Sequence, residues 1–323
     1  MDYKSAGVNT ELASSLISSL KDNINQLNNR SAVGRVTTSV GGFAGSFQPG
    51  EAFAGMELVA CTDGVGTKIQ LAKEQSFYSG LGQDLVAMCV NDLYCMGAKP
   101  AFFLDYISCG KLNESWYRPV LESIMQACMQ TGSALLGGET AEHPGVMPDD
   151  DFDLAGFCVG LRPQGFIFPR EDIEAGDIVF ALPSSGLHSN GFSLVRKLRA
   201  EKQNLKEFQD PNWVQKNLLA PTIVYKNIPE LATLHTVKAS VHVTGGGIPE
   251  NLPRVLTNGL NYKIENWYPF PMDVYDFLQD HLELEPMKET FNMSMGMLVI
   301  GKEEALPAIK KFYPNVKVVG SIC

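Results

Sequence analysis

The sequence predicts an α/β (α+β) fold built as two domains. The chain has 323 residues, of which 45% are hydrophobic, and this is enough to form two cores of ordinary size. Helical and strand-like hydrophobic patterns alternate along it, as they do in layered α/β structures. The segment 162–172 interrupts the pattern with two prolines, a glycine and mixed charge. We therefore expect domains over 1–165 and 166–323.

The first domain is expected to open with an amphipathic helix over residues 11–27. Leu12, Leu16, Leu20 and Ile24 recur there at helical spacing, behind polar residues suited to a cap. Strand and helix patterns then alternate, at 58–61 (strand), 85–96 (helix), 102–107 (strand), 120–129 (helix) and a further strand that ends at Gly137 and Gly138.

The second domain repeats this alternation. A strand over 177–183 leads into a helix over 191–200, and an apolar stretch beginning at residue 238 leads into three glycines. Two further strands are expected at 293–300 and 316–322.

Composition limits the class of partner. The net charge is -10, and 36 acidic and 26 basic residues are spread without long runs, which argues against nucleic-acid or membrane-surface binding and favours a small-molecule substrate. The seven cysteines include no C-x-x-C pair and are expected to be reduced thiols. No apolar run approaches the roughly 18 residues of a membrane helix, so we expect a cytoplasmic protein.

The segment ACTDGVGTK, residues 60–68, indicates nucleotide binding. Glycines let the backbone approach a phosphate closely, a lysine adds a cation, and an aspartate can hold the magnesium that accompanies a nucleotide. The alternative is a strand-to-turn connection with incidental charge, because neither a Walker A motif nor a complete G-x-G-x-x-G is present. The candidate residues are Asp63, Gly64, Gly66, Thr67 and Lys68.

Asp92 lies on the apolar stripe of the helix predicted over 85–96. A desolvated carboxylate is costly, so this position predicts a metal, a lysine partner or a raised pKa, with a buried salt bridge or a cap as the structural alternative. In ALLGGETAEH, a strand is again expected to run into Gly137, Gly138, Glu139 and Thr140. Asp63, Asp92 and Glu139 would then converge as oxygen ligands for Mg²⁺.

Three glycine-containing or polar loops could bind anions or substrate. The segment 39–47, with Gly41, Gly42 and Gly45, could cover phosphates through its amides or be a plain surface loop. Between a strand and a helix, a polar loop could hold a phosphate, ribose or amide. A glycine turn at 245–247 is suited to an anion or to a tight structural turn. The loop residues are Ser185, His188, Ser189 and Asn190, and the turn consists of Gly245, Gly246 and Gly247.

These segments, in this order, resemble the phosphoribosylformylglycinamidine cyclo-ligase (aminoimidazole ribonucleotide synthetase) family. The segments are DYKSAGVN, GGFAGSF, TDGVGTK, GQDLVAMCVNDLYCMGAKPAFFLDYISCGKL, GGETAEHPGVM, DLAGFCVG, SSGLHSNGFSLVRK, LLAPT and HVTGGGIPENLPRVL. They span nearly the whole chain, whereas LRPQGFIFPRED departs from the family pattern.

The resemblance implies an AIR-synthetase-like homodimer whose N-terminal domains pair their sheets into a barrel. It implies ATP-dependent ring closure of formylglycinamidine ribonucleotide (FGAM), with ATP and Mg²⁺ bound by the glycine loop and by the 63–68 and 137–140 segments. Lys68, Asp92 and His188 would be catalytic, and the polar loop and the glycine turn would bind FGAM. Other members of the superfamily, such as FGAM synthetase, or a nucleotide-binding regulator are the alternatives.

Overall fold

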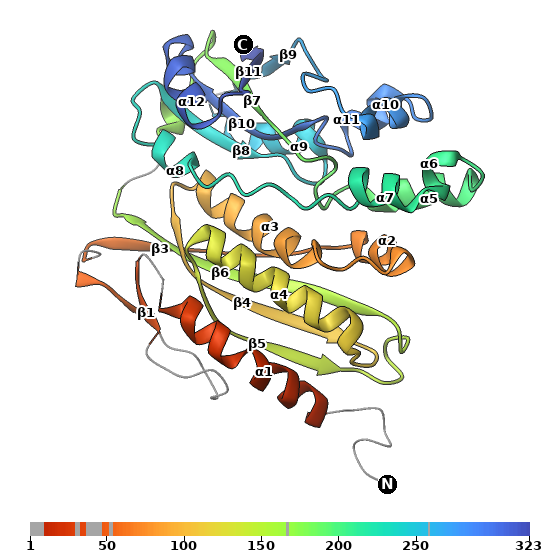
Figure 1. The fold of residues 1–323 in the computed structure, drawn as a ribbon. Helices are drawn as coiled ribbons and strands as arrows, with labels where there is room; N and C mark the ends of the chain where they lie inside the picture. Colours follow the sequence, from red (N-terminus) through yellow and green to blue (C-terminus); the bar gives the residue numbers. More distant parts are fainter. Residues whose placement is uncertain (1–9, 30–32, 37–46, 52–53, 166–167, 258) are drawn as a thin grey trace. The chain divides into compact units, whose positions relative to one another are not determined.

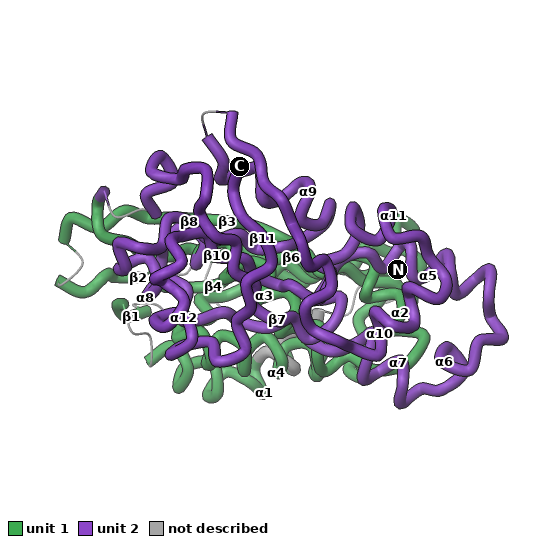
Figure 2. The backbone as a smooth tube through the Cα atoms, turned by 90° about the horizontal axis from the view of Figure 1, so that it is seen from above, with its two compact units in different colours: residues 1–93, 99–164 green, residues 94–98, 165–323 purple. Residues whose placement is uncertain are grey.

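The computed structural model describes residues 10–29, 33–36, 47–51, 54–165, 168–257 and 259–323 (Figure 1). The chain divides into two compact units (Figure 2). Unit 1 comprises Met1–Leu93 and Lys99–Gln164, and unit 2 comprises Tyr94–Ala98 and Gly165–Cys323. The main division thus lies beside the predicted boundary.

Unit 1 contains a four-stranded mixed sheet in the order β3–β6–β4–β5. The central strand β6 pairs antiparallel with both β3 and β4, whereas β4 and β5 are parallel. A parallel pair needs a crossover connection, and α4 supplies it. The strands are β3 (Met56–Gly64), β4 (Lys99–Cys109), β5 (Ala134–Glu142) and β6 (Phe152–Pro163).

The two faces of this sheet differ. On β4, Phe103, Asp105 and Ile107 alternate as buried residues, while Tyr106 between them is exposed. The buried face lies against helices, since a side chain at Gly156 would meet Cys89 of α3. The helices of the unit are α1 (Thr10–Asn28), α2 (Lys68–Gln75), α3 (Leu81–Cys95) and α4 (Glu114–Thr131), and a separate antiparallel pair is formed by β1 (Gly34–Val36) and β2 (Phe47–Pro49).

Unit 2 contains a five-stranded antiparallel sheet in the order β8–β10–β7–β11–β9. Every residue of β8 and β10 is buried, so both faces of these strands are covered. The strands are β7 (Ile178–Pro183), β8 (Val237–His242), β9 (Tyr262–Ile264), β10 (Met295–Gly301) and β11 (Lys317–Ile322). The helices are α5 (Phe192–Glu201), α6 (Lys206–Gln209), α7 (Pro211–Asn217), α8 (Ile228–Leu231), α9 (Gly247–Asn251), α10 (Asp273–Gln279), α11 (Leu284–Lys288) and α12 (Leu306–Phe312).

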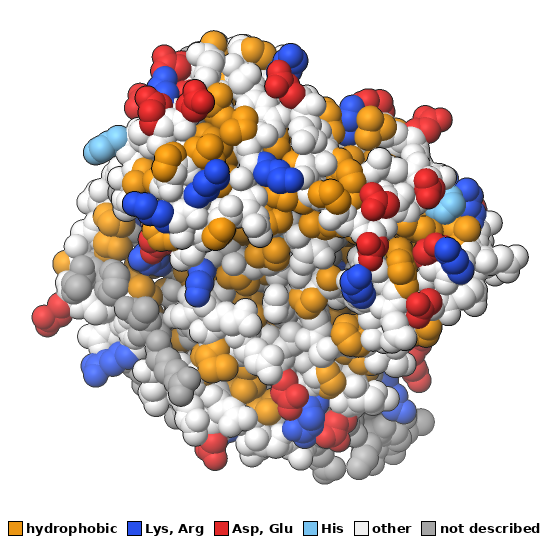
Figure 3. All heavy atoms as spheres, turned by 45° about the horizontal axis from the view of Figure 1, so that its top comes forward, with side chains coloured by type: hydrophobic (Ala, Val, Ile, Leu, Met, Phe, Trp, Pro, Cys, Tyr) orange, Lys and Arg blue, Asp and Glu red, His pale blue; other side chains and the backbone are white. Residues whose placement is uncertain are grey.

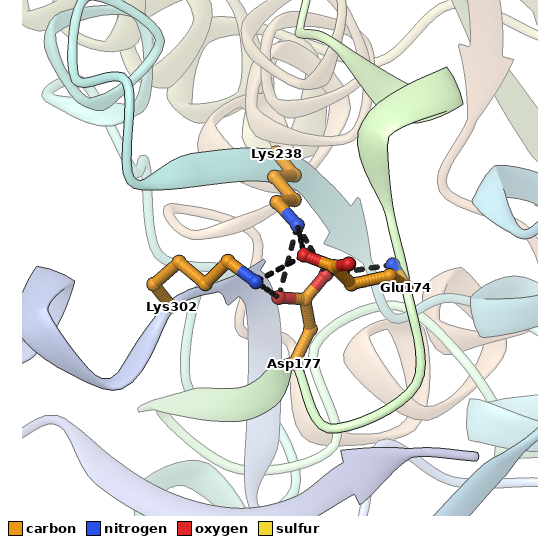
Figure 4. A network of polar contacts seen from close by, with 4 residues as sticks. All are labelled: Glu174, Asp177, Lys238 and Lys302. Carbon is orange, nitrogen blue, oxygen red and sulfur yellow. Dashed lines mark hydrogen bonds and ion pairs between the residues drawn. The ribbon is translucent and has the colours of Figure 1, made fainter.

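A network of two carboxylates and two ammonium groups joins the start of β7 to β8 and to the end of β10 (Figure 4). The buried Asp177 carboxylate accepts from Lys238 Nζ at 2.8 Å and lies 3.4 Å from Lys302 Nζ. Glu174 accepts from Lys302 Nζ and, at 3.2 Å, from Lys238 Nζ, and these two cations hold the pKa of Glu174 below its usual range. Segments more than a hundred residues apart in sequence are thereby joined.

The structure confirms the predicted α/β (α+β) class and the helices expected over 11–27, 85–96, 120–129 and 191–200, although their ends differ. The predicted end of a strand at Gly137 and Gly138 was wrong, because β5 continues through both glycines to Glu142. Cys89, Cys128 and Cys158 are buried free thiols. Within the described residues, no helix has the length and apolarity needed to cross a bilayer.

Candidate functional site

In unit 1, the end of β3 brings Asp63 into a row of residues that crosses the sheet. Asp63 pairs with Gly156, which pairs with Asp105, which in turn pairs with Gly138. Residues opposite one another on paired strands point to the same face. Asp63 therefore faces the helices, where its carboxylate accepts from the backbone N–H of Gly64 at 2.7 Å.

Asp105 is the acidic residue of this row that sequence reasoning missed. Its side chain is buried beside Gly138, and a Cβ at position 138 would collide with its carboxylate. Burial raises the pKa of Asp105 to about 7, and the charge of Glu139 adds to the rise. The signal was available, because Asp105 alternates with Phe103 and Ile107 in an otherwise apolar strand face.

Lys68 begins α2 and is fully buried against Asp84 of α3. Its Nζ lies 2.7 Å from the Asp84 carboxylate, and both side chains are 0% exposed. Burial lowers the pKa of Lys68, and the Asp84 charge opposes this shift. Asp84 is thus a buried, lysine-paired acid that sequence reasoning missed, whereas Asp92, for which a metal, a lysine partner or a raised pKa was predicted, is half-buried. The role of Lys68 as a phosphate contact stays a prediction.

The structure does not bring Asp63, Asp92 and Glu139 together as a metal site. Glu139 pairs with Tyr106, on the face opposite to Asp63 and Asp105. In the part of the chain that the structure describes, no group of three or more His, Cys, Asp or Glu side chains could hold a metal ion. The expected convergence failed because β5 runs on as a strand, so that alternation turns Glu139 away.

The other predicted nucleotide contacts have mixed outcomes. Gly64 ends β3, and Gly66 and Thr67 form the turn into α2. Thr140 faces the helices and shares a 2.7 Å hydrogen bond with the Tyr117 hydroxyl of α4. Gly41, Gly42 and Gly45 lie outside the described residues.

A surface cleft of about 620 Å³ lies elsewhere in unit 1, between α2 and the start of α4. Lys73 on its wall pairs with Asp150 at 3.1 Å and with Asp151. The other lining residues include Tyr78, Lys111 and Trp116, and none of the predicted site residues lines the cleft.

In unit 2, three connections meet at one end of the sheet. Strands β7 and β8 flank β10 and run antiparallel to it, so the segments after β7 and β8 lie beside the segment before β10. The backbone N–H of Ser184 donates to the Ser294 carbonyl at 2.9 Å, and that of Val243 donates to the Gly296 carbonyl at 3.1 Å. This end of the sheet holds both predicted substrate-binding segments.

The polar loop over 184–190, which we call the substrate loop, is folded tightly. His188 has a φ of 58° and is 1% exposed, and its Nε2 accepts from the Ser185 backbone N–H at 3.3 Å. The Ser185 hydroxyl donates to the Pro221 carbonyl at 2.6 Å, and the Ser189 hydroxyl lies 3.3 Å from that of Thr222. Of the four predicted contacts, Ser185 and Asn190 are half-buried and therefore accessible.

The turn Gly245, Gly246 and Gly247 adjoins the substrate loop. Asn190 Oδ1 lies 3.5 Å from the place where a Cβ of Gly245 would be. Gly247 needs to be glycine, because its φ is 59° and a Cβ there would collide with the Lys288 carbonyl. The structure therefore brings the predicted substrate residues of unit 2 together.

The AIR synthase related protein family matches the chain in two parts. Its N-terminal domain matches residues 50–162 and its C-terminal domain matches residues 174–323. The fold is thus the two-domain AIR-synthase-related architecture.

Close relatives narrow the class further. The chain is 37% identical over 331 residues to the phosphoribosylformylglycinamidine cyclo-ligase of Synechococcus sp. (strain JA-2-3B'a(2-13)), covering 100% of the chain and 93% of that protein. It is 41% identical to the enzyme of that name from Leptospira interrogans serovar copenhageni, over 96% of the chain and 91% of that protein. The chain belongs to the phosphoribosylformylglycinamidine cyclo-ligase family.

Solved structures share the fold at lower identity. A thiamine-monophosphate kinase from Stenotrophomonas maltophilia K279a superposes with a TM-score of 0.69 at 18% identity, over 94% of this chain and 93% of that one. The hydrogenase maturation protein HypE in complex with ATP gives a TM-score of 0.68 at 17% identity, over 98% and 88% of the two chains.

Proposed function

We propose that the chain catalyses ATP-dependent closure of the imidazole ring of purines. FGAM would be converted to 5-amino-1-(5-phospho-D-ribosyl)imidazole (AIR), with release of ADP and phosphate, in de novo purine synthesis. The observation that carries the proposal is identity of 37% to 41% with cyclo-ligases over nearly the whole chain, which includes both units.

The chemistry explains the need for ATP. An amidine nitrogen attacks a formamide carbonyl and must expel its oxygen, which is a poor leaving group. Transfer of the γ-phosphoryl group to the formyl oxygen gives an imino-phosphate, from which the nitrogen displaces phosphate. Phosphoryl transfer is mostly positioning and electrostatic stabilisation, so the protein needs to supply cations, amides and a proton acceptor.

The two units would divide the work. In unit 1, the backbone turn at Gly64 and Gly66, together with Asp63 and Asp92, would bind the nucleotide. The solved HypE structure, which is similar in fold, is a complex with ATP and supports this assignment. In unit 2, Ser185 and Asn190 with the glycine turn would hold FGAM through hydroxyl, amide and backbone N–H groups. His188 stays a candidate proton acceptor that the substrate loop encloses.

Magnesium would enter with the triphosphate. Mg²⁺ in nucleotide enzymes keeps several waters and is held by one or two carboxylates plus phosphate oxygens, so a three-carboxylate cage is not needed. Asp63 and Asp92 are the proposed protein ligands, and Glu139 is left with no metal role in this proposal.

A homodimer is supported by the open face of the unit 1 sheet. Leu58, Tyr106 and Phe157 are 68%, 43% and 41% exposed, and strand pairing places all three on the face opposite to the helices. An apolar sheet face of this kind is typical of a protein interface.

On the face of the molecule shown in Figure 3, acidic and basic side chains are interspersed, which favours small-molecule substrates in a cytoplasmic enzyme.

One assay tests the function. Purified protein is supplied with MgATP and FGAM, and both ADP and AIR are measured. Formation of AIR with equal ADP supports the cyclo-ligase. ADP formed only with another acceptor would indicate a different superfamily member, and nucleotide binding without ADP would indicate a regulator.

Asp92→Asn should lower turnover by orders of magnitude while leaving a folded protein. The amide keeps the size of the side chain but removes the charge proposed to hold the cation. The rate of AIR formation and the circular dichroism spectrum give the two readouts. Asp149→Asn, which alters an exposed loop carboxylate, is the matched control. Undiminished turnover of Asp92→Asn would refute its metal role.

A further inference from the structure

We propose that Asn292 is a positioning residue that fixes the substrate loop of unit 2 for binding of FGAM. The inference rests on the proposed function, and it adds a residue that lies outside all the motifs noted in the sequence. Asn292 is 1% exposed and so does not reach a ligand itself. It would act through the backbone of the substrate loop.

Both halves of the Asn292 amide are used. Its Nδ2 donates to the Gly186 carbonyl at 2.9 Å, across 106 positions of sequence. Its Oδ1 accepts from the Tyr275 hydroxyl at 2.7 Å. Tyr275 is itself fully buried, so both polar halves of the Asn292 amide have protein partners that are shielded from water.

The Gly186 carbonyl is the point at which the substrate loop is anchored. It also accepts from the Ser184 hydroxyl at 2.8 Å, so two donors fix it. The Ser184 backbone N–H donates to the Ser294 carbonyl, two residues beyond Asn292. The segment 292–294 therefore holds the first turn of the substrate loop at two adjacent points.

The backbone of this segment is strained. Met293 and Ser294 are consecutive non-glycine residues with φ of 49° and 67°, and both are 0% exposed. Left-handed conformations are unfavourable for such residues, and they persist where surrounding contacts over-determine them, often at functional sites. Here the strain directs the Ser294 carbonyl and the Asn292 amide toward the same loop.

The groups proposed to contact the substrate are sequence neighbours of the anchored residues. Ser185 lies between the two anchored residues, and His188 accepts from the Ser185 backbone N–H. If the Gly186 carbonyl were released, the hydroxyl of Ser185 and the ring of His188 would lose their fixed positions. Binding of FGAM should weaken, whereas binding of ATP by unit 1 should not.

The test compares Asn292→Asp with Tyr275→Phe. Asn292→Asp keeps the oxygen facing Tyr275 but places a carboxylate oxygen against the Gly186 carbonyl. Tyr275→Phe removes the other hydrogen bond of Asn292 and leaves the donor to Gly186. We expect the KM for FGAM to rise at least about tenfold in Asn292→Asp and less than about twofold in Tyr275→Phe, with the KM for MgATP within about twofold in both.

Hydrogen exchange supplies a readout that does not require turnover. Amides of the substrate loop should exchange at least about tenfold faster in Asn292→Asp than in wild type or Tyr275→Phe. If Asn292→Asp fails to fold, Ser184→Ala removes the second donor to Gly186 and should change both readouts in the same direction.

The outcomes are distinct. Unchanged loop exchange, or an equal rise in both KM values with faster exchange throughout unit 2, would overturn the positioning role. A wild-type protein that forms no AIR would instead overturn the proposed function, and loop exchange alone would then decide whether Asn292 anchors the loop.

Discussion

Charged groups buried in unit 1 are the residue-scale features with the clearest energetic consequences. Lys68 and Asp84 are both 0% exposed, and their attraction offsets the cost of removing two charges from water. Among the residues that the structure describes, no lysine forms an ion pair with the buried Asp105, and burial raises its pKa. The two sites therefore respond differently to loss of charge.

Asp84→Asn should destabilise the protein by about 3–5 kcal/mol, because it leaves the Lys68 ammonium buried without its compensating charge. The free energy of unfolding in urea measures the effect. Glu114→Gln, which breaks the exposed pair of Glu114 with Arg118 on α4, is the control and should cost less than about 0.5 kcal/mol. Equal effects of the two substitutions would contradict the argument.

Asp105→Asn should change how stability depends on pH. The folded pKa is about 7 against an ordinary value of 3.8, so between these values the native state keeps a proton that the unfolded chain has lost. This carboxyl therefore favours folding at low pH, and its contribution is lost as pH rises to about 7. The variant lacks this loss. Its free energy of unfolding should therefore rise relative to that of wild type by up to a few kcal/mol across that window.

Urea unfolding at several pH values from about 4 to 8 tests this prediction. Asp149→Asn removes an exposed carboxylate and should track wild type throughout. A stability difference between Asp105→Asn and wild type that does not vary with pH would exclude the raised pKa.

At the scale of single elements, α4 forms the crossover between the parallel strands β4 and β5, and its start is capped by Asn113. The Asn113 side chain accepts from the Ser115 backbone N–H at 2.9 Å, which satisfies one of the first N–H groups of the helix. The cap thus stabilises the connection on which the parallel pair depends.

Asn113→Ala should lower the free energy of unfolding by about 1 kcal/mol through loss of this cap. Thermal and urea unfolding measure the change. Gln126→Ala, at an exposed position inside the same helix, should stay within about 0.5 kcal/mol of wild type. A cap that contributes nothing would make the two variants indistinguishable.

Sequence patterns located most of these elements where hydrophobic spacing was regular. The leucines of α1 and the apolar runs of β7 and β10 are examples. Patterns failed where the role of a residue depends on the side chains that lie beside it in space. Gly137 and Gly138 suggested a strand end, yet the Asp105 carboxylate needs the space that Gly138 leaves. The start of α3 at Leu81 was missed, and with it the buried Asp84.

The candidate site was predictable where its residues lie in one segment. The substrate loop and the glycine turn were identified from local composition, and the structure places them together. Asn292 was not predictable, because its role depends on a hydrogen bond to Gly186 across 106 residues. The predicted metal site depended on which face of the sheet Glu139 occupies. Because the strand was predicted to end at Gly138, the prediction placed Glu139 outside it and could not assign it to a face.

At the scale of the whole molecule, the open face of the unit 1 sheet determines the expected assembly. Leu58→Asp should convert the proposed dimer to a monomer, because it places a charge on the same apolar face as Tyr106 and Phe157. Sedimentation velocity measures the mass. Val146→Asp, at an 81% exposed position in a loop, should leave the dimer intact. A dimer that survives Leu58→Asp uses another surface.

Strand β11 has a further consequence for biosynthesis of the chain. It lies between β7 and β9 in the sheet of unit 2, yet it follows both of them in sequence. During translation, β9 therefore has no partner strand and one edge of β7 stays open until residues 317–322 have left the ribosome. Unit 1 has all four strands of its main sheet by Pro163, so a ribosome-bound chain can complete that sheet while the second is unfinished.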